Sequence, residues 1–166
     1  MRTSTRVVVG VDGSMAGLRA LRLAVAQAQL RHAELHALRA WTFRPKGRGG
    51  MAGYDEQEYA VYESTVAAFA DAMGGAPADL DLVLGTVLGP PGKALVQYAD
   101  REEDLLVVGS SQVRSLRRLF HPPVARYCAA HAACPVLVVP PDGFAKQARR
   151  EGMGRSIRRD LPQFIG

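Results

Sequence analysis

Five short apolar runs, separated by longer stretches with helical periodicity, organise the first 140 residues of the chain. Each run is dense in valine and leucine, as in strands that are buried on both faces of a sheet. Between the runs, apolar residues recur three and four positions apart, as they do on one face of a helix. The predicted strands are, in chain order, 6–14, 33–41, 80–88, 104–110 and 134–140.

This alternation of strand and helix predicts one doubly wound α/β domain, whose five-stranded parallel sheet carries helices on both faces. We expect the domain to cover residues 1–141 and a basic tail to cover 142–166, where the periodicity is lost. Ligands of such sheets bind at the carboxyl ends of the strands, beside the point where the strand order reverses. Asp12 and Gly109 both lie at such ends.

Three details of the helices follow from the sequence. Ser14 is suited to cap the first helix, and Gly74 is suited to end the second. The second helix also carries a stripe of large side chains at helical spacing, which predicts that they face the core. The members of this stripe are Tyr59, Tyr62, Val66, Phe69 and Met73.

Composition narrows the class of protein. The chain has 166 residues, of which 48% are apolar and 22% charged, and this is typical of a globular domain. No apolar run approaches the roughly 20 residues needed to span a bilayer, and the run at the N-terminus breaks at Asp12, too early for a signal peptide. We therefore expect a soluble cytoplasmic protein with no membrane contact, and the two cysteines suit a reducing compartment.

The net charge of +5 is unevenly distributed. Residues 142–166 hold six basic and three acidic side chains, so that the tail supplies +3 and the rest of the chain +2. Because the tail supplies much of the basicity, the charge does not predict a nucleic-acid-binding protein. The tail is either flexible or docks onto a partner.

The sequence gives little support for a metal site or for a catalytic nucleophile. His121, Cys128, His131 and Cys134 lie close in sequence but lack the clip-like spacing of a structural zinc site, so core packing is the favoured interpretation and no metal is expected. The cysteines also lack the spacing of a redox pair. No nucleophile elbow surrounds a serine. We therefore expect no enzyme, with a weak ATPase as the alternative.

Three segments together resemble the universal stress protein family: "VVVGVDGS", "VLGTVLGPPGKALVQYA" and "DLLVVGSS…CPVLVVP". The resemblance covers about residues 5–140 and implies a strand order of 3-2-1-4-5. It also implies homodimers formed through the last strand, here Val136, Leu137, Val138 and Val139. Some members of the family bind ATP and others do not. The last strand would lie at a sheet edge, and pairing with a second copy would cover its unpaired amides. The alternative is that the tail folds back over this edge.

The ATP motif of that family is only partly present. A gapless placement puts Gly109 at the first glycine, Gln112 and Pro122 at the second and third, Pro123 at the hydroxyl position and Val124 after it. A phosphate-binding turn works by directing backbone N–H groups at oxygen atoms. Proline has no N–H, and two or three lost charge-assisted bonds, each worth about 1.5–3 kcal/mol, weaken binding by several powers of ten. No tightly bound cofactor is expected, and ATP binds weakly if at all.

Other residues leave a nucleotide site open. Asp12 matches the acidic position that the resemblance implies, and Ala40 matches the strand position whose backbone meets adenine. Asp12 is equally suited to a turn in which its side chain bonds nearby amides. Arg114, Arg117 and Arg118 could grip phosphate, although a solvated surface is favoured for them. The predicted function is a stress-response regulator that acts as a homodimer through contacts with an unknown protein. The alternative is an adenine-nucleotide sensor with slow or no hydrolysis.

Overall fold

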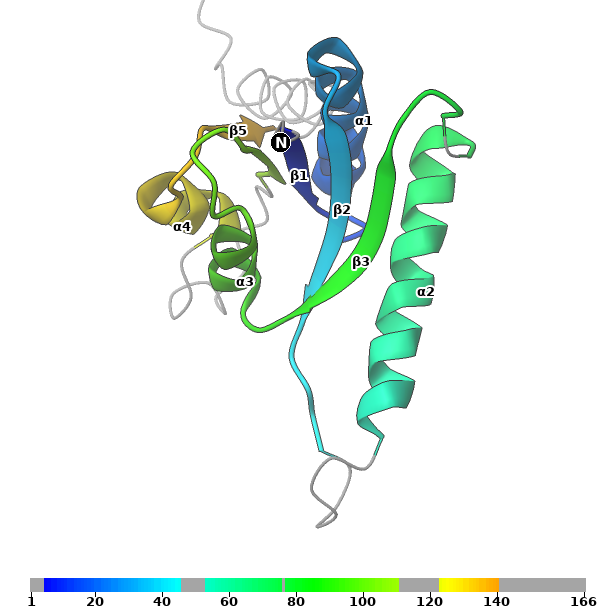
Figure 1. Cartoon of the computed structure of the whole chain (residues 1–166). Helices are drawn as coiled ribbons and strands as arrows, with labels where there is room; N and C mark the ends of the chain where they lie inside the picture. The colour runs from blue at the N-terminus through cyan, green and yellow to red at the C-terminus, as the bar shows by residue number, and fades with distance from the viewer. Residues whose placement is uncertain (1–4, 46–52, 76, 111–122, 141–166) are drawn as a thin grey trace, which may run out of the picture.

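The computed structural model describes residues 5–45, 53–75, 77–110 and 123–140. Within these residues, five strands alternate with four helices (Figure 1). The elements are β1 (Arg6–Gly10), α1 (Met15–Arg31), β2 (Glu34–Trp41), α2 (Tyr54–Met73), β3 (Leu82–Leu88), α3 (Pro91–Tyr98), β4 (Leu105–Gly109), α4 (Val124–His131) and β5 (Val136–Val139).

The strands form a single sheet in the order β3-β2-β1-β4-β5, and every neighbouring pair is parallel. This confirms the predicted fold class and strand order. Alternate residues of β1 point into two separate cores: Val7 and Val9 pack beneath α1 and α2, whereas Val8 packs beneath α3 and α4. Figure 1 shows α1 and α2 on one side of the sheet and α3 and α4 on the other. The strand order reverses at β1, and this places the carboxyl ends of β1 and β4 beside an open crevice.

The predicted helix ends are confirmed by backbone geometry. The hydroxyl of Ser14 accepts a hydrogen bond from the amide of Gly17 at 3.0 Å, so Ser14 caps α1. Gly74 ends α2 with φ of 71°, a left-handed conformation that glycine adopts without steric cost. Pro91 starts α3, where its missing N–H would have had no partner inside the helix. β1 is shorter than predicted, since Val11 to Ser14 form the turn into α1.

The prediction for the buried face of α2 is wrong in its N-terminal half. Tyr59 is 65% exposed and Tyr62 is 39% exposed, whereas Phe69 is buried as expected. The residues of α2 that are buried are Thr65, Ala68, Phe69 and Ala72. Small side chains let the helix approach the sheet closely, and they give a weak hydrophobic signal. The pattern of large residues therefore predicted a buried face that is rotated about the helix axis from the face that α2 packs on the sheet.

A buried ion pair joins β1 to the start of β4, at the sheet edge opposite the crevice. Arg6 donates to both carboxylate oxygens of Asp104, at 2.9 and 2.6 Å, and Asp104 is only 1% exposed. Arg6 also donates to Asp100 and lies over the ring of Tyr98. The hydrogen bond to Asp104 is the main cause that raises the pKa of Arg6. This contact ties together segments that are 98 positions apart in the sequence.

None of the helices in the described part of the chain combines the length and apolar character needed to cross a membrane. The tail at 142–166 lies outside the described residues, so the boundary at 141 stays a prediction.

Candidate functional site

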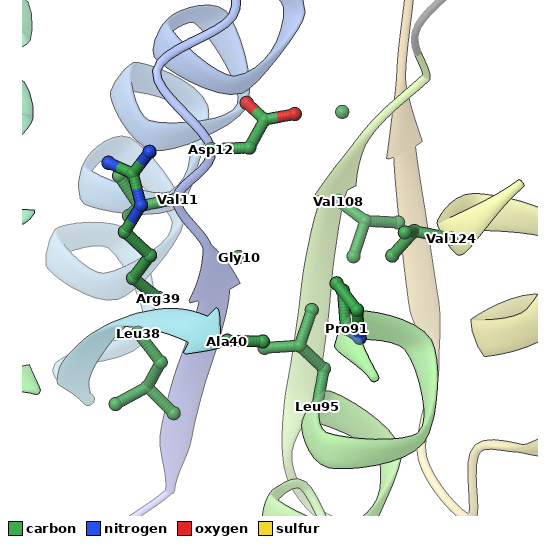
Figure 2. Close-up of a pocket in the computed structure, with 11 residues that line it drawn as sticks. Gly10, Val11, Asp12, Leu38, Arg39, Ala40, Pro91, Leu95, Val108 and Val124 are labelled. Carbon is green, nitrogen blue, oxygen red and sulfur yellow. The ribbon is translucent and has the colours of Figure 1, made fainter. Parts of the chain in front are cut away.

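A pocket opens at the carboxyl edge of the sheet, in the crevice where the strand order reverses. Its cavity of about 240 Å³ lies between β1, β2, β4 and the start of α3 (Figure 2). Its lining is mainly aliphatic, with Asp12 and Arg39 as the charged members. The lining residues are Gly10, Val11, Asp12, Leu38, Arg39, Ala40, Pro91, Leu95, Val108, Gly109 and Val124.

This pocket brings together four of the predicted site residues. Asp12 and Ala40 come from the β1 and β2 side, and Gly109 and Val124 come from the β4 and α4 side. The volume lies below the range of about 300–1,000 Å³ that holds a drug-sized ligand. The described walls therefore suit a small ligand, or one part of a larger one such as a planar base.

Asp12 has a local structural role. Its Oδ1 accepts hydrogen bonds from the backbone amide of Ser14 at 2.9 Å and from the Ser14 hydroxyl at 2.7 Å. This is the turn in which an aspartate bonds amides two residues further on. Its Oδ2 accepts no hydrogen bond from the described residues, and Figure 2 shows the carboxylate directed across the crevice toward β4. One oxygen atom thus builds the turn while the other is available to a ligand.

Gly17 leaves room for the Asp12 carboxylate, a supporting role that the sequence reasoning missed. A Cβ atom on Gly17 would lie 2.1 Å from Oδ1 of Asp12, far inside contact distance. Any larger residue would push the carboxylate out of its turn. The sequence does place a glycine in the first turn of the predicted helix. Because glycine lowers helix propensity, its presence there indicates that a close neighbour leaves no room for a side chain.

Gly109 also has a structural reason to be glycine. A Cβ atom there would lie 2.7 Å from the carbonyl carbon of Ala16 and 2.9 Å from the amide nitrogen of Gly17. These are backbone atoms at the start of α1, and backbone cannot move aside as a flexible side chain can. The close approach of α1 to the end of β4 therefore requires glycine, whether or not a phosphate binds beside it.

The N-cap position of α4 offers an anion no amide hydrogen. Pro123 occupies the N-cap position with φ of −52° and makes no side-chain capping bond. Proline contributes no N–H, so the residue that the resemblance placed at a hydroxyl position gives neither a hydroxyl nor an amide donor. The helix that follows has eight residues, Val124–His131.

The other predicted phosphate-side residues lie outside the described residues. These are Gln112, Pro122, Arg114, Arg117 and Arg118. The charged side chain that the structure does place at the pocket, besides Asp12, is Arg39. Its guanidinium rises beside Val11 in Figure 2.

Cys128 and Cys134 belong to the same buried core, whereas His131 lies at the surface. Cys128 is buried against Gly92, whereas His131 is exposed, stacks on Tyr127 and lies 2.9 Å from the Tyr127 carbonyl oxygen. Within the described ranges, no three side chains of the types that bind metals come together, and His121 falls outside those ranges. Burial raises the pKa of the Cys128 thiol to about 11 and also raises that of Cys134. Both thiols are therefore poor nucleophiles at neutral pH.

Several aliphatic residues that line the pocket were not predicted as site residues. Leu38, Leu95 and Val108 are buried in the core beneath α3 and α4 and also line the pocket. Their position in the sequence could have indicated this, because residues at the carboxyl ends of parallel strands share one edge of the sheet. Pro91 lines the pocket as well, from the first turn of α3.

The sequence model of the universal stress protein family matches residues 3–140. The chain belongs to the universal stress protein family. Among similar solved structures is a universal stress protein in complex with cAMP, which is 29% identical, covers 84% of this chain and 99% of its own, and has a TM-score of 0.59. Its complex shows that a relative with this fold holds a cyclic adenine nucleotide.

More distant members support the fold. The UspA protein of Lactobacillus plantarum is 24% identical, with coverage of 82% and 97% and a TM-score of 0.61. A family member from Arabidopsis thaliana with AMP bound is 18% identical, with coverage of 84% and 94% and a TM-score of 0.53. At these identities the likeness shows the shared fold alone.

Proposed function

We propose that this universal stress protein is a cytoplasmic regulator that acts as a homodimer through protein contacts and does not hold ATP tightly. In this proposal the pocket accepts the nucleoside part of an adenine nucleotide, while the phosphate groups add little affinity. No catalytic step is assigned to it. The single observation that carries the proposal is Pro123 at the entrance of α4, without an amide hydrogen or a capping side chain.

The energetic reasoning starts from the donors that an anion needs. A helix N-terminus binds phosphate because its first backbone amides are unpaired and point at the ligand. Pro123 removes one of these amides, and Pro122 precedes it in the sequence. Two missing charge-assisted bonds at about 1.5–3 kcal/mol each correspond to a roughly 10²- to 10⁴-fold loss in affinity.

The described part of the pocket suits the base and the ribose of a nucleoside. Leu38, Leu95 and Val108 give apolar walls for a flat ring. Oδ2 of Asp12, to which no described residue donates, suits a ribose hydroxyl, which donates to a carboxylate. The relative in complex with cAMP supports an adenine ligand with a single phosphate.

Calorimetry with ATP and Mg²⁺ tests the proposal on the wild-type protein and on Asp12→Asn. Asparagine keeps an oxygen that accepts from Ser14 and so preserves the turn, while it removes the charge. We expect ATP binding weaker than micromolar in the wild type. Micromolar ATP binding that Asp12→Asn weakens at least tenfold would overturn the proposal.

The dimer in this proposal forms through β5. The strand lies at the end of the sheet, and Val138 is 40% exposed although it is apolar. Antiparallel pairing with a second copy would make one continuous sheet and cover that edge. β5 has only four residues and Pro135 and Pro140 flank it, so the interface must also use neighbouring side chains. Light scattering of the purified protein measures the oligomeric state directly.

A second candidate function is an adenine-nucleotide sensor. The observation that favours it is the carboxylate of Asp12, whose Oδ2 has no donor among the described residues and which lines the pocket together with Arg39 and Ala40. Its discriminating measurement is mass analysis of small molecules released when the purified protein is denatured. A stoichiometric adenine nucleotide would support the sensor, and its absence would leave the first proposal standing.

A further inference from the structure

The outward side of α2 is unusually aromatic and acidic for a surface helix. We call this side the outer α2 surface, made of Asp55, Glu56, Tyr59, Tyr62 and Glu63, all of them exposed. The two tyrosines are among the large apolar residues that the described part of the chain leaves exposed. Leu88 of β3, the strand on which α2 packs, is another and is 54% exposed. An exposed aromatic cluster with a polar rim is typical of an interaction site.

The charge of this surface is one-sided. The sequence of α2 holds five acidic residues and no lysine or arginine. Among the residues that the structure describes, none of these five carboxylates is in an ion pair. Arg22 of the neighbouring helix α1 donates instead to the carbonyl oxygen of Ala72, at the far end of α2. The charge of Glu63 raises the pKa of Tyr59, as expected where negative charge is uncompensated.

We propose that residues 142–166 of the same chain bind to the outer α2 surface. This segment holds six basic side chains, Lys146, Arg149, Arg150, Arg155, Arg158 and Arg159, against three acidic ones. It also carries Met153, Ile157, Leu161, Phe164 and Ile165, which can pack on tyrosine rings. Arginine both pairs with carboxylates and stacks on aromatic faces, and the outer α2 surface presents both partners side by side.

Residues 142–166 are long enough to reach the outer α2 surface from the end of β5. The described chain ends at Pro140, whose carbonyl oxygen accepts a hydrogen bond from Arg19 of α1 at 2.9 Å, on the side of the sheet that also carries α2 (Figure 1). Four strand intervals of about 4.8 Å separate β5 from β3, close to 20 Å. At about 3.3 Å per extended residue, eight residues cover that span with some excess. Residues 149–166, with five of the six cations, remain to lie along the helix.

A second copy of α2 is a poorer occupant of this surface. Two such helices side by side would bring Glu56 and Glu63 near the like charges of the partner helix, and like charges across an interface are destabilising. The basic segment meets the same surface with opposite charge. This inference does not depend on whether the pocket binds a nucleotide.

The test uses the full chain and hydrogen exchange of the backbone amides in 142–166. We compare the wild type with the double variant Glu56→Gln/Glu63→Gln and with a matched control, Glu102→Gln/Glu103→Gln. The control removes two exposed carboxylates from the turn before β4. We expect amides of the segment to be protected in the wild type and the control. Their exchange should be roughly three- to tenfold faster in the Glu56/Glu63 variant, because exposed ion pairs contribute about 0.2–1 kcal/mol each. Raising the salt concentration should have the same effect.

Hydroxyl-radical footprinting of Tyr59 and Tyr62 gives the reciprocal measurement. Replacing Arg155, Arg158 and Arg159 with glutamine should increase labelling of both tyrosines and leave Tyr127 unchanged. The inference is overturned if 142–166 exchanges at the rate of an unprotected peptide in every form. Equal protection in the Glu56/Glu63 variant, which would mean docking elsewhere, also overturns it. So does protection that grows with protein concentration, because the segment would then bind to another copy.

Discussion

Substitution of Gly109 by alanine should destabilise the fold, independently of any ligand. The added Cβ would lie 2.7 and 2.8 Å from the carbonyl carbon and oxygen of Ala16, at the first turn of α1. Overpacking of this kind costs about 1–3 kcal/mol, and the cost here falls in the upper part of that range because the obstructing atoms are backbone. To relieve the contact, α1 must move away from β4.

The matched control is Gly85→Ala in the middle of β3. Its Cβ would come no nearer than 3.3 Å to a neighbour, a methyl group of Leu38 that can adjust. Glycine to alanine at a position with ordinary backbone angles can even stabilise slightly, by about 0.4–1 kcal/mol. We therefore expect Gly85→Ala to stay within about 1 kcal/mol of the wild type.

The assay is urea unfolding followed by circular dichroism and by the fluorescence of Trp41, the single tryptophan. With a slope of about 2 kcal/mol per molar urea, a loss of 2–3 kcal/mol lowers the midpoint by about 1–1.5 M. A midpoint for Gly109→Ala within about 0.25 M urea of the wild-type midpoint would contradict this packing constraint. Gly109 would then be free of the packing constraint, and its presence would need a ligand to explain it.

Three further predictions concern the ion pair, the proposed dimer edge and the buried thiol. Asp104→Ala should cost about 3–5 kcal/mol in urea unfolding, because Arg6 would be left with a largely buried and partly unpaired charge; a loss below 1 kcal/mol would argue against this. Val138→Lys should convert dimers to monomers in light scattering at micromolar concentration, whereas the same change at the exposed Leu30 of α1 should not; unchanged dimers would exclude β5 as the interface. The pKa of Cys128 is raised to about 11, and the unfolded thiol loses its proton near pH 9, so the free energy of unfolding should fall as pH rises from 9 to 11. The fall should be smaller in Cys128→Ala, as measured by urea midpoints at pH 8 and 10.5, and equal falls would contradict the assignment.

The sheet could be predicted from sequence because its evidence is local. Each buried parallel strand is a continuous apolar run, and Asp12 and Gly109 lie at strand ends that one sheet edge must bring together. The capping roles of Ser14 and Gly74 can likewise be predicted from the residues next to them in the sequence.

The features that were missed depend on distances that sequence does not carry. Gly109 was assigned to a phosphate loop, whereas its closest neighbours are backbone atoms of Ala16 and Gly17, far away along the chain. The pairing of Arg6 with Asp104 has no local signal at all. Tyr59 was predicted to be buried because large side chains dominate a hydrophobic pattern, while α2 packs through alanine and threonine. A shift of one residue in phase was enough to turn the predicted face outward.

In the proposed function, Pro122 and Pro123 precede α4 in the sequence and leave the pocket without two backbone amide donors for phosphate. Calorimetry that compares adenosine with ATP and Mg²⁺, on the wild type and on Pro122→Gly/Pro123→Ser, tests this most directly. We expect the wild type to bind both ligands with affinities within about tenfold of each other. The variant should bind ATP at least about 10²- to 10⁴-fold more tightly, with adenosine unchanged, because two backbone amide donors are regained and the serine adds a hydroxyl. A wild type that already binds ATP a hundredfold more tightly than adenosine, with no gain in the variant, would contradict it.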